Sequence, residues 1–368
     1  MRILHASDTF WPTVGGIEVM VRTLAERQAA AGHTVTVVAR TPATGPGDPV
    51  GPLTICRDPT MLARLVEDAD VVHGHVSAYS PLALHALEAG GRRGTPTVAT
   101  VHSVWGRAWP LFRGAAAVRG WTDLPIRWAA VSSIAAAPVR RALGGTEVRV
   151  LPNGVDTAFW APSSAPAGRP AVTLVAAMRM ARRKRPLELV SMLARARRLL
   201  GPDAEVVAHL VGDGPLLPDV RRAIRDRGLQ SWVHTTGDLG HDALRELYAR
   251  ADIFLAPARL ESFGLAALEA RAAGLCVLAR DGTGISGFVS HGREGLLSSG
   301  DGQMVRQLAE VCRDDRLRLR ITGHNRAVPP ALDWSSVLGL HDDAYAEAAL
   351  VPRPGPIRSA AALASATP

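Results

Sequence analysis

Glu261-Ser262-Phe263-Gly264-Leu265-Ala266-Ala267-Leu268-Glu269 is the stretch that decides the fold. A short apolar run precedes it at residues 252–257, and good helix formers follow it as far as Gly274. We therefore expect a strand, a loop and a helix, with the Ser-Phe-Gly triplet at the helix start. The unpaired N–H groups of a helix start suit a phosphate, and the two glutamates could hydrogen-bond sugar hydroxyls.

The two glutamates have other interpretations. A glycosidase holds its two carboxyls roughly 5–9.5 Å apart. Eight residues of continuous helix would place Glu261 and Glu269 roughly 12 Å apart, so we expect binding of a polyol rather than acid–base work by an adjacent pair. Two glutamates on a solvated helix face, without function, are the third interpretation.

The motif resembles the Glu-x7-Glu signature of the retaining, nucleotide-sugar-dependent glycosyltransferases of family 4. The resemblance implies that Glu261 contacts hydroxyls of the donor sugar and that Glu269 contacts the ribose. It also implies that Phe263, Gly264 and Leu265 offer backbone N–H groups to the diphosphate or the sugar.

Length and composition limit the class of protein. A chain of 368 residues fits two domains better than one core, and 47% apolar with 21% charged residues is typical of a soluble globular protein. Three widely spaced cysteines argue against a disulfide framework and a zinc cluster. The chain enters a predicted strand at once and has no uninterrupted apolar stretch of about 18 residues, so we expect a cytoplasmic protein without a signal peptide or membrane span.

The net charge of +8 allows several anionic partners. A nucleic acid is one of them, but the arginines are scattered and only 5% of residues are aromatic. Anionic small molecules or an anionic membrane surface explain the charge at least as well. We therefore expect no nucleic-acid partner.

Residues 1–160 carry a first series of strands and helices, which predicts a parallel sheet. Gly15-Gly16 at the first loop–helix junction could form a tight turn or let the backbone approach a phosphate. The resemblance implies that this pair faces the donor. Strands are predicted at residues 3–6, 35–38, 69–75, 97–102 and 129–133, and helices at 17–31 and 81–89; residues 148–156 close the domain and resemble the family's Pro-Asn-Gly-Val-Asp segment.

Three histidines stand out in this series. His73 and His75 share a face of one strand, so a metal pair is conceivable; no third ligand is evident, and we expect histidines that line a cleft or are satisfied in the core, without metal. His102 ends its strand, where doubly wound folds place ligands. The resemblance implies a functional histidine near the donor sugar at this place, so His102 is our candidate.

Residues 105–128 interleave tryptophan with arginine. This pattern suits a peripheral contact with an anionic membrane or an acceptor groove. The alternative is a helix pair that covers the sheet while its arginines extend into solvent.

A second series begins with a strand at 172–176, a basic loop and a helix at 187–200. A basic loop at a strand end suits a diphosphate, and the resemblance assigns this role to Arg179 and Lys184. The chain departs from the family pattern at Met178, where a glycine is usual. Arg182, Arg183 and Arg185 fit a solvated surface better than the matched pair does.

Two further turns follow. The resemblance matches Gly212 to the first glycine of a Gly-x-Gly-Pro turn after a strand at 206–211, and places Leu239 where the family reads the base largely through backbone groups. Residues 282–287 spell the dinucleotide fingerprint G-x-G-x-x-G, but glycines break the segment that follows, so we expect no dinucleotide there.

The predicted fold is α/β with GT-B architecture: two Rossmann-like parallel-sheet domains facing across a cleft. Residues 1–160 form the predicted acceptor-side domain and 161–332 the donor-nucleotide domain. A helix at 333–350 is expected to return to the first domain. Residues 161–170 are the expected linker, and residues 351–368 are expected to be disordered.

The predicted activity is retaining transfer of a hexose from a GDP- or UDP-linked donor to a hydroxyl of an unknown acceptor, which could be a lipid, a glycan or a small molecule. His102, Arg179, Lys184 and Glu261 are the candidate catalytic residues. We expect no metal or other cofactor, because no Asp-x-Asp occurs in a strand-end loop. The alternatives are a non-catalytic protein that binds sugar nucleotides or nucleic acid, and a phosphorylase with pyridoxal phosphate.

Overall fold

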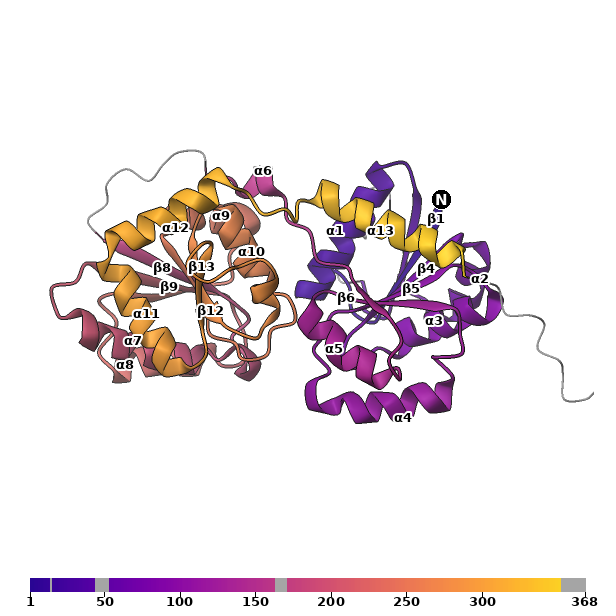
Figure 1. The fold of residues 1–368 in the computed structure, drawn as a ribbon, viewed down its shortest axis with the longest axis horizontal. Helices are drawn as coiled ribbons and strands as arrows, with labels where there is room; N and C mark the ends of the chain where they lie inside the picture. Colours follow the sequence, from indigo (N-terminus) through magenta and orange to yellow (C-terminus); the bar gives the residue numbers. More distant parts are fainter. Residues whose placement is uncertain (14, 44–52, 163–170, 352–368) are drawn as a thin grey trace, which may run out of the picture. The chain divides into compact units, whose positions relative to one another are not determined.

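The computed structural model describes residues 1–13, 15–43, 53–162 and 171–351. These residues form two compact units (Figure 1). The first unit comprises residues 1–130, 136–151 and the chain from Leu338 onward, and the second comprises residues 131–135 and 152–337. This division assigns residues 152–160 to the second unit, whereas we had drawn the boundary after residue 160. Most of the expected linker and almost all of the expected C-terminal tail lie outside the described residues.

Each unit is built on one sheet in which every described strand pair is parallel. The first sheet has the order β3-β2-β1-β4-β5-β6-β7, and the second has the order β10-β9-β8-β11-β12-β13. The strands are β1 (Arg2–Ser7), β2 (Thr34–Ala39), β3 (Leu53–Cys56), β4 (Val71–Val76), β5 (Thr97–Val101), β6 (Ile126–Ala130), β7 (Val148–Val150), β8 (Val172–Ala177), β9 (Val206–Val211), β10 (Val233–Gly237), β11 (Ile253–Ala256), β12 (Cys276–Arg280) and β13 (Gly295–Ser298).

Both strand orders reverse direction once. In the first sheet the chain moves outward from β1 to β2 and β3 and then returns to place β4 on the other side of β1. In the second sheet β8 and β11 are neighbours in the same way. Loops at the carboxyl ends of strands diverge at such a switch point, which is where open α/β sheets bind ligands.

The crossover helices begin and end at residues suited to those positions. Pro81 and Pro186 stand at the first positions of α3 and α7, where a missing N–H costs nothing. Gly94 ends α3 in the left-handed region. The helices are α1 (Gly16–Ala30), α2 (Leu62–Asp68), α3 (Pro81–Arg93), α4 (Trp109–Arg119), α5 (Ser133–Ala142), α6 (Thr157–Trp160), α7 (Pro186–Leu200), α8 (Leu217–Asp226), α9 (His241–Ala249), α10 (Leu265–Ala272), α11 (Asp301–Arg313), α12 (Asp315–Ala327) and α13 (Trp334–Ala349).

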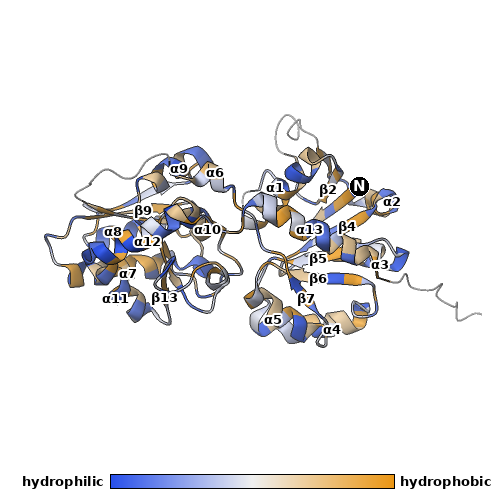
Figure 2. Cartoon of the chain, turned by 45° about the horizontal axis from the view of Figure 1, so that its top comes forward, coloured by the Kyte–Doolittle hydropathy of each residue, from blue (hydrophilic) through white to orange (hydrophobic). Residues whose placement is uncertain are grey.

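The strands supply most of the core. All six residues of β4 are buried, and β1 is buried after its first residue, as expected for parallel strands covered on both faces. In the second unit, the core cluster joins residues of β8, β9, β11 and β12 to apolar positions of α7 and α11. The surface helices show the complementary pattern in Figure 2, where hydrophilic and hydrophobic residues share helices such as α7 and α8.

The sequence-based boundaries differ from the structure in one informative place. We expected a strand at residues 129–133, but β6 spans Ile126–Ala130 and Ser133 already begins α5. Trp128 therefore lies inside a strand, where its ring is 3% exposed. The short β3 and β13 were not predicted at all, because four-residue edge strands carry little periodicity.

The C-terminal helix α13 contributes to the first unit from Leu338 onward. Tyr345 of this helix is buried and hydrogen-bonds both Gln28 of α1 and His73 of β4. Helix α13 is thus part of the core around β1 and β4.

Candidate functional site

The switch point of the second sheet brings together two predicted residues. Lys184 lies in the loop after β8 and Glu261 in the loop after β11, and β8 and β11 are adjacent strands. Lys184 Nζ lies 2.5 Å from Glu261 Oε2, and both side chains are mostly buried, 26% and 14% exposed. The resemblance had suggested separate partners for them, a diphosphate and a sugar; in the structure the two side chains form an ion pair.

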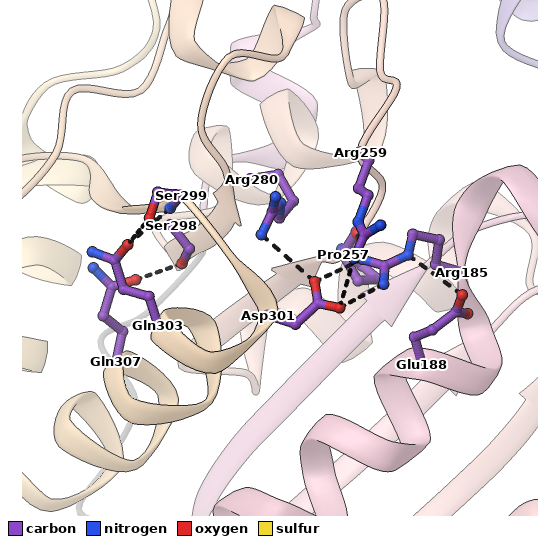
Figure 3. A network of polar contacts seen from close by, with 10 residues as sticks. All are labelled: Arg185, Glu188, Pro257, Arg259, Arg280, Ser298, Ser299, Asp301, Gln303 and Gln307. Carbon is purple, nitrogen blue, oxygen red and sulfur yellow. Dashed lines mark hydrogen bonds and ion pairs between the residues drawn. The ribbon is translucent and has the colours of Figure 1, made fainter.

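Arg185 anchors the loop that carries Lys184. Its backbone is left-handed at φ 62°, a conformation that costs a non-glycine residue roughly 1 kcal/mol. Its guanidinium donates two hydrogen bonds to Asp301, at 2.9 and 2.7 Å, and one to the carbonyl of Pro257. Figure 3 shows that Arg259 and Arg280 converge on the same carboxylate, at 3.1 and 3.5 Å.

These contacts correct the sequence interpretation of Arg185. We expected a solvated surface arginine, but the residue is only 8% exposed. The pKa of Asp301 is lowered to about 2, chiefly by its hydrogen bond from Arg185. Asp301 begins α11, Pro257 directly follows β11, and Arg185 itself directly precedes α7. Arg185 therefore connects three elements and holds the two loops of the switch point together.

Arg179 lies nearer the end of β8 and is exposed. No described side chain pairs with its guanidinium. Arg182 and Arg183 are also exposed, in the short 3-10 turn η3 (Arg182–Lys184), as expected for a solvated surface. An exposed guanidinium in the same loop as Lys184 is available to an anionic ligand.

The start of α10 is shaped by glycine. Gly264 precedes the helix in the left-handed region, at φ 93°, and a Cβ there would lie 2.5 Å from Ile285 Cγ1. Phe263 is buried against Phe288, at 5.5 Å between ring centroids. Leu265 begins α10, so the first N–H groups of the helix follow Gly264 directly, as the motif predicted.

The fingerprint-like glycine run has a packing role. Gly284 N–H donates to the carbonyl of Glu261 at 2.8 Å, and a Cβ on Gly284 would lie 2.2 Å from the carbonyl oxygen of Ser262. Only the short 3-10 turn η4 (Gly284–Gly287) follows, not a phosphate-binding α-helix. The run therefore supports the Glu261 loop through close backbone packing.

Glu269 lies within α10, beyond the loop that carries Glu261. Burial raises the pKa of its carboxyl to about 8, although part of the side chain remains accessible. Among the described residues no donor pairs with this carboxylate. At neutral pH the group is therefore mostly protonated and can both donate and accept a hydrogen bond, which suits a vicinal diol.

Two backbone positions complete this edge of the second sheet. Gly212 follows β9 at φ 118°, and a Cβ there would lie 2.1 Å from the carbonyl oxygen of Met178, so only glycine fits. Met178 itself thus occupies the place where a glycine was expected without disturbing this close approach. Leu239 lies in the loop after β10 and is half-buried, between the exposed residues Asp238 and Gly240. All these positions lie at carboxyl ends of strands.

The first unit holds the remaining candidates. Gly16 begins α1 and Gly15 precedes it with extended backbone; residue 14 is outside the described part. At the switch point of this sheet, the carboxylate of Asp8 accepts hydrogen bonds from the N–H groups of Leu82 and Ala83 at the start of α3, each 3.1 Å long. This helix start is therefore already occupied by a carboxylate of the chain itself.

His102 directly follows β5 and is 6% exposed. Its Nε2 lies 3.0 Å from Nδ1 of His75, whose Nε2 lies 2.9 Å from Nδ1 of His5. Burial is the main cause that lowers the pKa of His102 to about 3 and of His5 to about 4. The candidate histidine is thus the end of a buried cluster rather than an isolated side chain.

The same cluster tests the metal hypothesis. His5, His73 and His75 bring ring nitrogens within 4.8 Å of one another, and within the described ranges this is the one such group of three. All six ring nitrogens, however, have hydrogen-bond partners at 2.7–3.0 Å, among them Gln28, Tyr345 and Thr100. Since a ligand nitrogen would have to give up such a partner, the geometry fits histidines satisfied in the core, the expected alternative.

Three of the four tryptophans of residues 105–128 are buried, and the fourth, Trp109, is half-buried. Trp105, Trp121 and Trp128 are each at most 4% exposed, and Trp105 stacks on Phe112 at 3.8 Å. Trp121 Nε1 and the Arg119 guanidinium both donate to the buried carboxylate of Glu88. The expectation of tryptophans at a membrane surface was wrong for these three. What α4 exposes instead is Leu111 and Val118, 78% and 86% accessible.

Sequence reasoning missed two features of the site. The Lys184–Glu261 contact joins residues 77 positions apart, and no sequence pattern relates them. Asp301 carried a faint signal, because an acidic residue after Gly300 is typical of a helix start. Its partner Arg185 could not be identified from the sequence.

None of the helices formed by the described residues is long and apolar enough to cross a membrane.

Comparison with known proteins identifies the two halves separately. The model of Glycosyltransferase Family 4 matches residues 14–159, and that of Glycosyl transferases group 1 matches residues 169–314. Alpha-maltose-1-phosphate synthase of Mycolicibacterium smegmatis is 30% identical over 67% of this chain and 68% of that protein. GDP-mannose:cellobiosyl-diphosphopolyprenol alpha-mannosyltransferase of Xanthomonas oryzae is 28% identical over 96% of this chain and 98% of that protein.

Other relatives are longer. A phosphatidylinositol N-acetylglucosaminyltransferase chain of Arabidopsis thaliana is 28% identical over 75% of this chain, which spans only 66% of that relative's length. Among solved structures, HepE of Anabaena in complex with UDP and glucose superposes with a TM-score of 0.74 at 17% identity, covering 94% of this chain and all of that chain. A glycosyltransferase from Rickettsia africae gives 0.73 at 15% identity, covering 95% and 99%. These neighbours establish the GT-B fold.

Proposed function

Because the chain belongs to glycosyltransferase family 4, we propose that it transfers a hexose, with retention of configuration, from a nucleoside diphosphate sugar to a hydroxyl acceptor. The bond between the anomeric carbon and the diphosphate oxygen breaks, and a bond to the acceptor oxygen forms. The acceptor proton leaves, and the nucleoside diphosphate is released.

The Lys184–Glu261 pair at the β8–β11 switch point carries this proposal. An anionic diphosphate that reached this edge could attract Lys184 and the exposed Arg179. Glu261, released from the pair, could then accept hydrogen bonds from sugar hydroxyls. The start of α10 at Gly264 and Leu265 adds N–H groups for negative charge.

The remaining roles follow the same chemistry. Glu269, whose pKa is raised to about 8, suits the ribose diol as a protonated carboxyl. The backbone around Gly212 and Leu239 is proposed to contact the nucleotide. Gly15 and Gly16 are proposed to approach the donor, and His102 is proposed to act on the transferred sugar by orientation and charge stabilisation, not as a nucleophile.

We propose that the leaving diphosphate is stabilised without a metal. Fixed cations and N–H dipoles can stabilise developing charge without rearranging. Arg179, Lys184 and the α10 start supply both kinds of group at one sheet edge. Among the described residues, the acidic pairs Asp314-Asp315 and Asp342-Asp343 lie at or in helices rather than in a strand-end loop.

The test is a panel of GDP- and UDP-linked hexoses incubated with the full chain, with and without EDTA. We expect release of the nucleoside diphosphate from at least one donor, equally fast in chelator, and an unchanged anomeric configuration in the product. Loss of activity in EDTA that Mg²⁺ or Mn²⁺ restores would contradict the metal-free account. Tight donor binding without any turnover would favour the alternative, a non-catalytic sugar-nucleotide binding protein.

The acceptor class is a further part of the proposal. The names of two relatives contain a phosphatidylinositol and a diphosphopolyprenol, which are lipids. In this chain, α4 exposes Leu111 and Val118 together with Arg113. Apolar side chains flanked by arginine suit an anionic bilayer surface, so we propose a lipid-linked acceptor reached by peripheral contact through α4.

A further inference from the structure

A continuous line of hydrogen bonds crosses the core of the first unit and ends at His102. It starts at Gln28 of α1, whose Oε1 lies 2.7 Å from Nε2 of His5. Nδ1 of His5 lies 2.9 Å from Nε2 of His75, and Nδ1 of His75 lies 3.0 Å from Nε2 of His102. Gln28, His5 and His75 are at most 1% exposed, so water does not compete for these contacts.

All three imidazoles in this line are neutral. Burial lowers the pKa of His5 to about 4 and of His102 to about 3, and holds the pKa of His75 well below its ordinary value. A neutral imidazole has one N–H donor and one bare nitrogen acceptor. Each contact between two neutral rings therefore contains one proton, and the choice made at one ring dictates the choice at the next.

The direction of the line is set at its Gln28 end. The Gln28 amide nitrogen donates to the Tyr345 hydroxyl at 3.0 Å, which leaves Oε1 to accept from His5. His5 must then carry its proton on Nε2 and accept at Nδ1 from His75. By the same rule His75 carries its proton on Nε2 and accepts from Nε2 of His102.

A side branch is compatible with this orientation of the Gln28 amide. The Tyr345 hydroxyl, having accepted from Gln28, can donate to Nδ1 of His73, 2.9 Å away. Nε2 of His73 can in turn donate to the Thr100 hydroxyl at 2.8 Å. Helix α13 is thereby joined to the line through the Tyr345 hydroxyl.

We propose that Gln28 is a positioning residue that fixes His102 as the tautomer protonated on Nε2, acting through His5 and His75. His102 then presents a bare Nδ1, which accepts a hydrogen bond and cannot donate one. Among the described residues no partner occupies this nitrogen. One further step rests on the proposed function: His102 would select a sugar hydroxyl that donates a hydrogen bond to Nδ1. The tautomer itself does not depend on that function.

The direct test is a nitrogen-15 spectrum of the full chain labelled at histidine, because protonated and bare imidazole nitrogens resonate far apart. His102 is assigned by the signal that disappears in His102→Gln. We expect His5, His75 and His102 all to be protonated on Nε2, with a preference of roughly tenfold or more at His102, the bias that about one hydrogen bond supplies. Protonation of His102 on Nδ1 would overturn the proposal from this spectrum alone.

Two variants test whether Gln28 fixes the tautomer of His102 through His5 and His75. Gln28→Met keeps the length of the side chain but can neither hold the Tyr345 contact nor accept from His5, and His75→Phe removes the middle ring. Each should lower the tautomer ratio at His102 by roughly tenfold. Val98→Ala is the matched control: Val98 is a buried neighbour of His73 in β5 that takes no part in the line, so the ratio should not change. An unchanged ratio in both test variants would refute the role of Gln28.

Activity provides a separate readout. If His102 faces the sugar as proposed, Gln28→Met should lower kcat of transfer by roughly tenfold while Val98→Ala retains it. If no nucleotide sugar is turned over, the proposed function fails, but the tautomer spectra still decide the present inference. If Gln28→Met lost the tautomer preference at His102 but kept kcat unchanged, the tautomer inference would stand and the proposed role of His102 towards the sugar would fail.

Discussion

Lys184 and Glu261 carry opposite charges, are mostly buried and lie 2.5 Å apart. When one partner of such a pair is removed, the remaining charge stays buried without compensation. The effect of each single substitution therefore includes the loss of the same interaction. The pair therefore has to be treated as one unit that a donor opens, rather than as two independent contacts.

We predict that Lys184→Ala and Glu261→Ala are not additive. Lys184→Ala should lower kcat/KM by roughly 10²–10³, and Glu261→Ala by roughly 10–150-fold. The double variant should lose much less than the product, because the second substitution removes an already uncompensated charge. The measurement is kcat/KM for the four corners of the cycle, with exposed Arg182→Ala as the control. Losses that multiply would show that the pair does not act as a unit.

Glu269 gives a pH-dependent prediction. Its folded-state pKa is raised from 4.5 to about 8, so the folded chain binds a proton that the unfolded chain has lost between these values. The Glu269 carboxyl therefore contributes stability that is lost as pH rises from about 4.5 to 8, and Glu269→Gln removes this contribution to the pH dependence.

Urea unfolding of both proteins at pH 5 and pH 8 measures this effect. The free energies of unfolding should be nearly equal at pH 5, and the Gln variant should be more stable by roughly 2–4 kcal/mol at pH 8, at about 1.4 kcal/mol per pKa unit. The comparison between variant and wild type cancels titration elsewhere. A difference independent of pH would place the Glu269 carboxyl in a well-solvated environment.

At the scale of elements, the loop after β11 depends on the loop after β12. Gly284 touches the backbone of Ser262 so closely that a Cβ would lie 2.2 Å from its carbonyl oxygen, whereas a Cβ on Gly287 would meet nothing within 4 Å. The two glycines belong to the same G-x-G-x-x-G run, so they form a matched pair for substitution.

Gly284→Ala should destabilise the chain by roughly 1–3 kcal/mol, because backbone has to move, and should displace the loop that carries Glu261. We expect a rise of tenfold or more in KM for the donor. Gly287→Ala should leave the unfolding midpoint and KM close to those of the wild type. If both variants behaved alike, the close approach of the two loops would not be the reason for the glycine.

Helix α4 yields the prediction on membranes. Leu111→Asp together with Val118→Asp should abolish sedimentation with vesicles that contain phosphatidylglycerol, because the two exposed side chains supply the apolar contact. Leu319→Asp on α12 is the control, since Leu319 is 61% exposed but lies in the second unit. Equal vesicle binding by wild type and double variant would exclude α4 as the contact surface.

At the scale of the whole molecule, the buried histidines make the first unit sensitive to acid. Burial lowers the pKa values of His5, His73, His75 and His102, all of which belong to that unit. The unfolded chain takes up protons below about pH 6.5 that the folded chain refuses. The stability contributed by these neutral histidines is therefore fully present above pH 6.5 and is lost as pH falls towards 4.

Each such histidine removes about 1.4 kcal/mol of unfolding free energy per pH unit, so four remove roughly 5 kcal/mol per unit. This is a large part of the stability of a typical domain, about 5–15 kcal/mol. In urea unfolding, the unfolding free energy of the first unit should fall steeply between pH 7.5 and 5. His73→Gln should reduce the slope of this free energy against pH by the contribution of one histidine, about 1.4 kcal/mol per pH unit. A stability that does not vary with pH would mean that the cluster is hydrated.

Sequence analysis alone predicted the two series of parallel strands, the helix after the Glu261 motif and the family. These features depend on local periodicity, on glycines at turns and on a motif within nine residues, all of which are local properties. The folded structure was needed to show that Lys184 pairs with Glu261, that Arg185 anchors their loops through Asp301, and that Gln28 is joined to His102. It also decided that Trp105, Trp121 and Trp128 are buried. The physical reason is that strand order at a switch point and packing across a sheet bring together residues far apart in the chain, and no periodicity along the chain encodes such contacts.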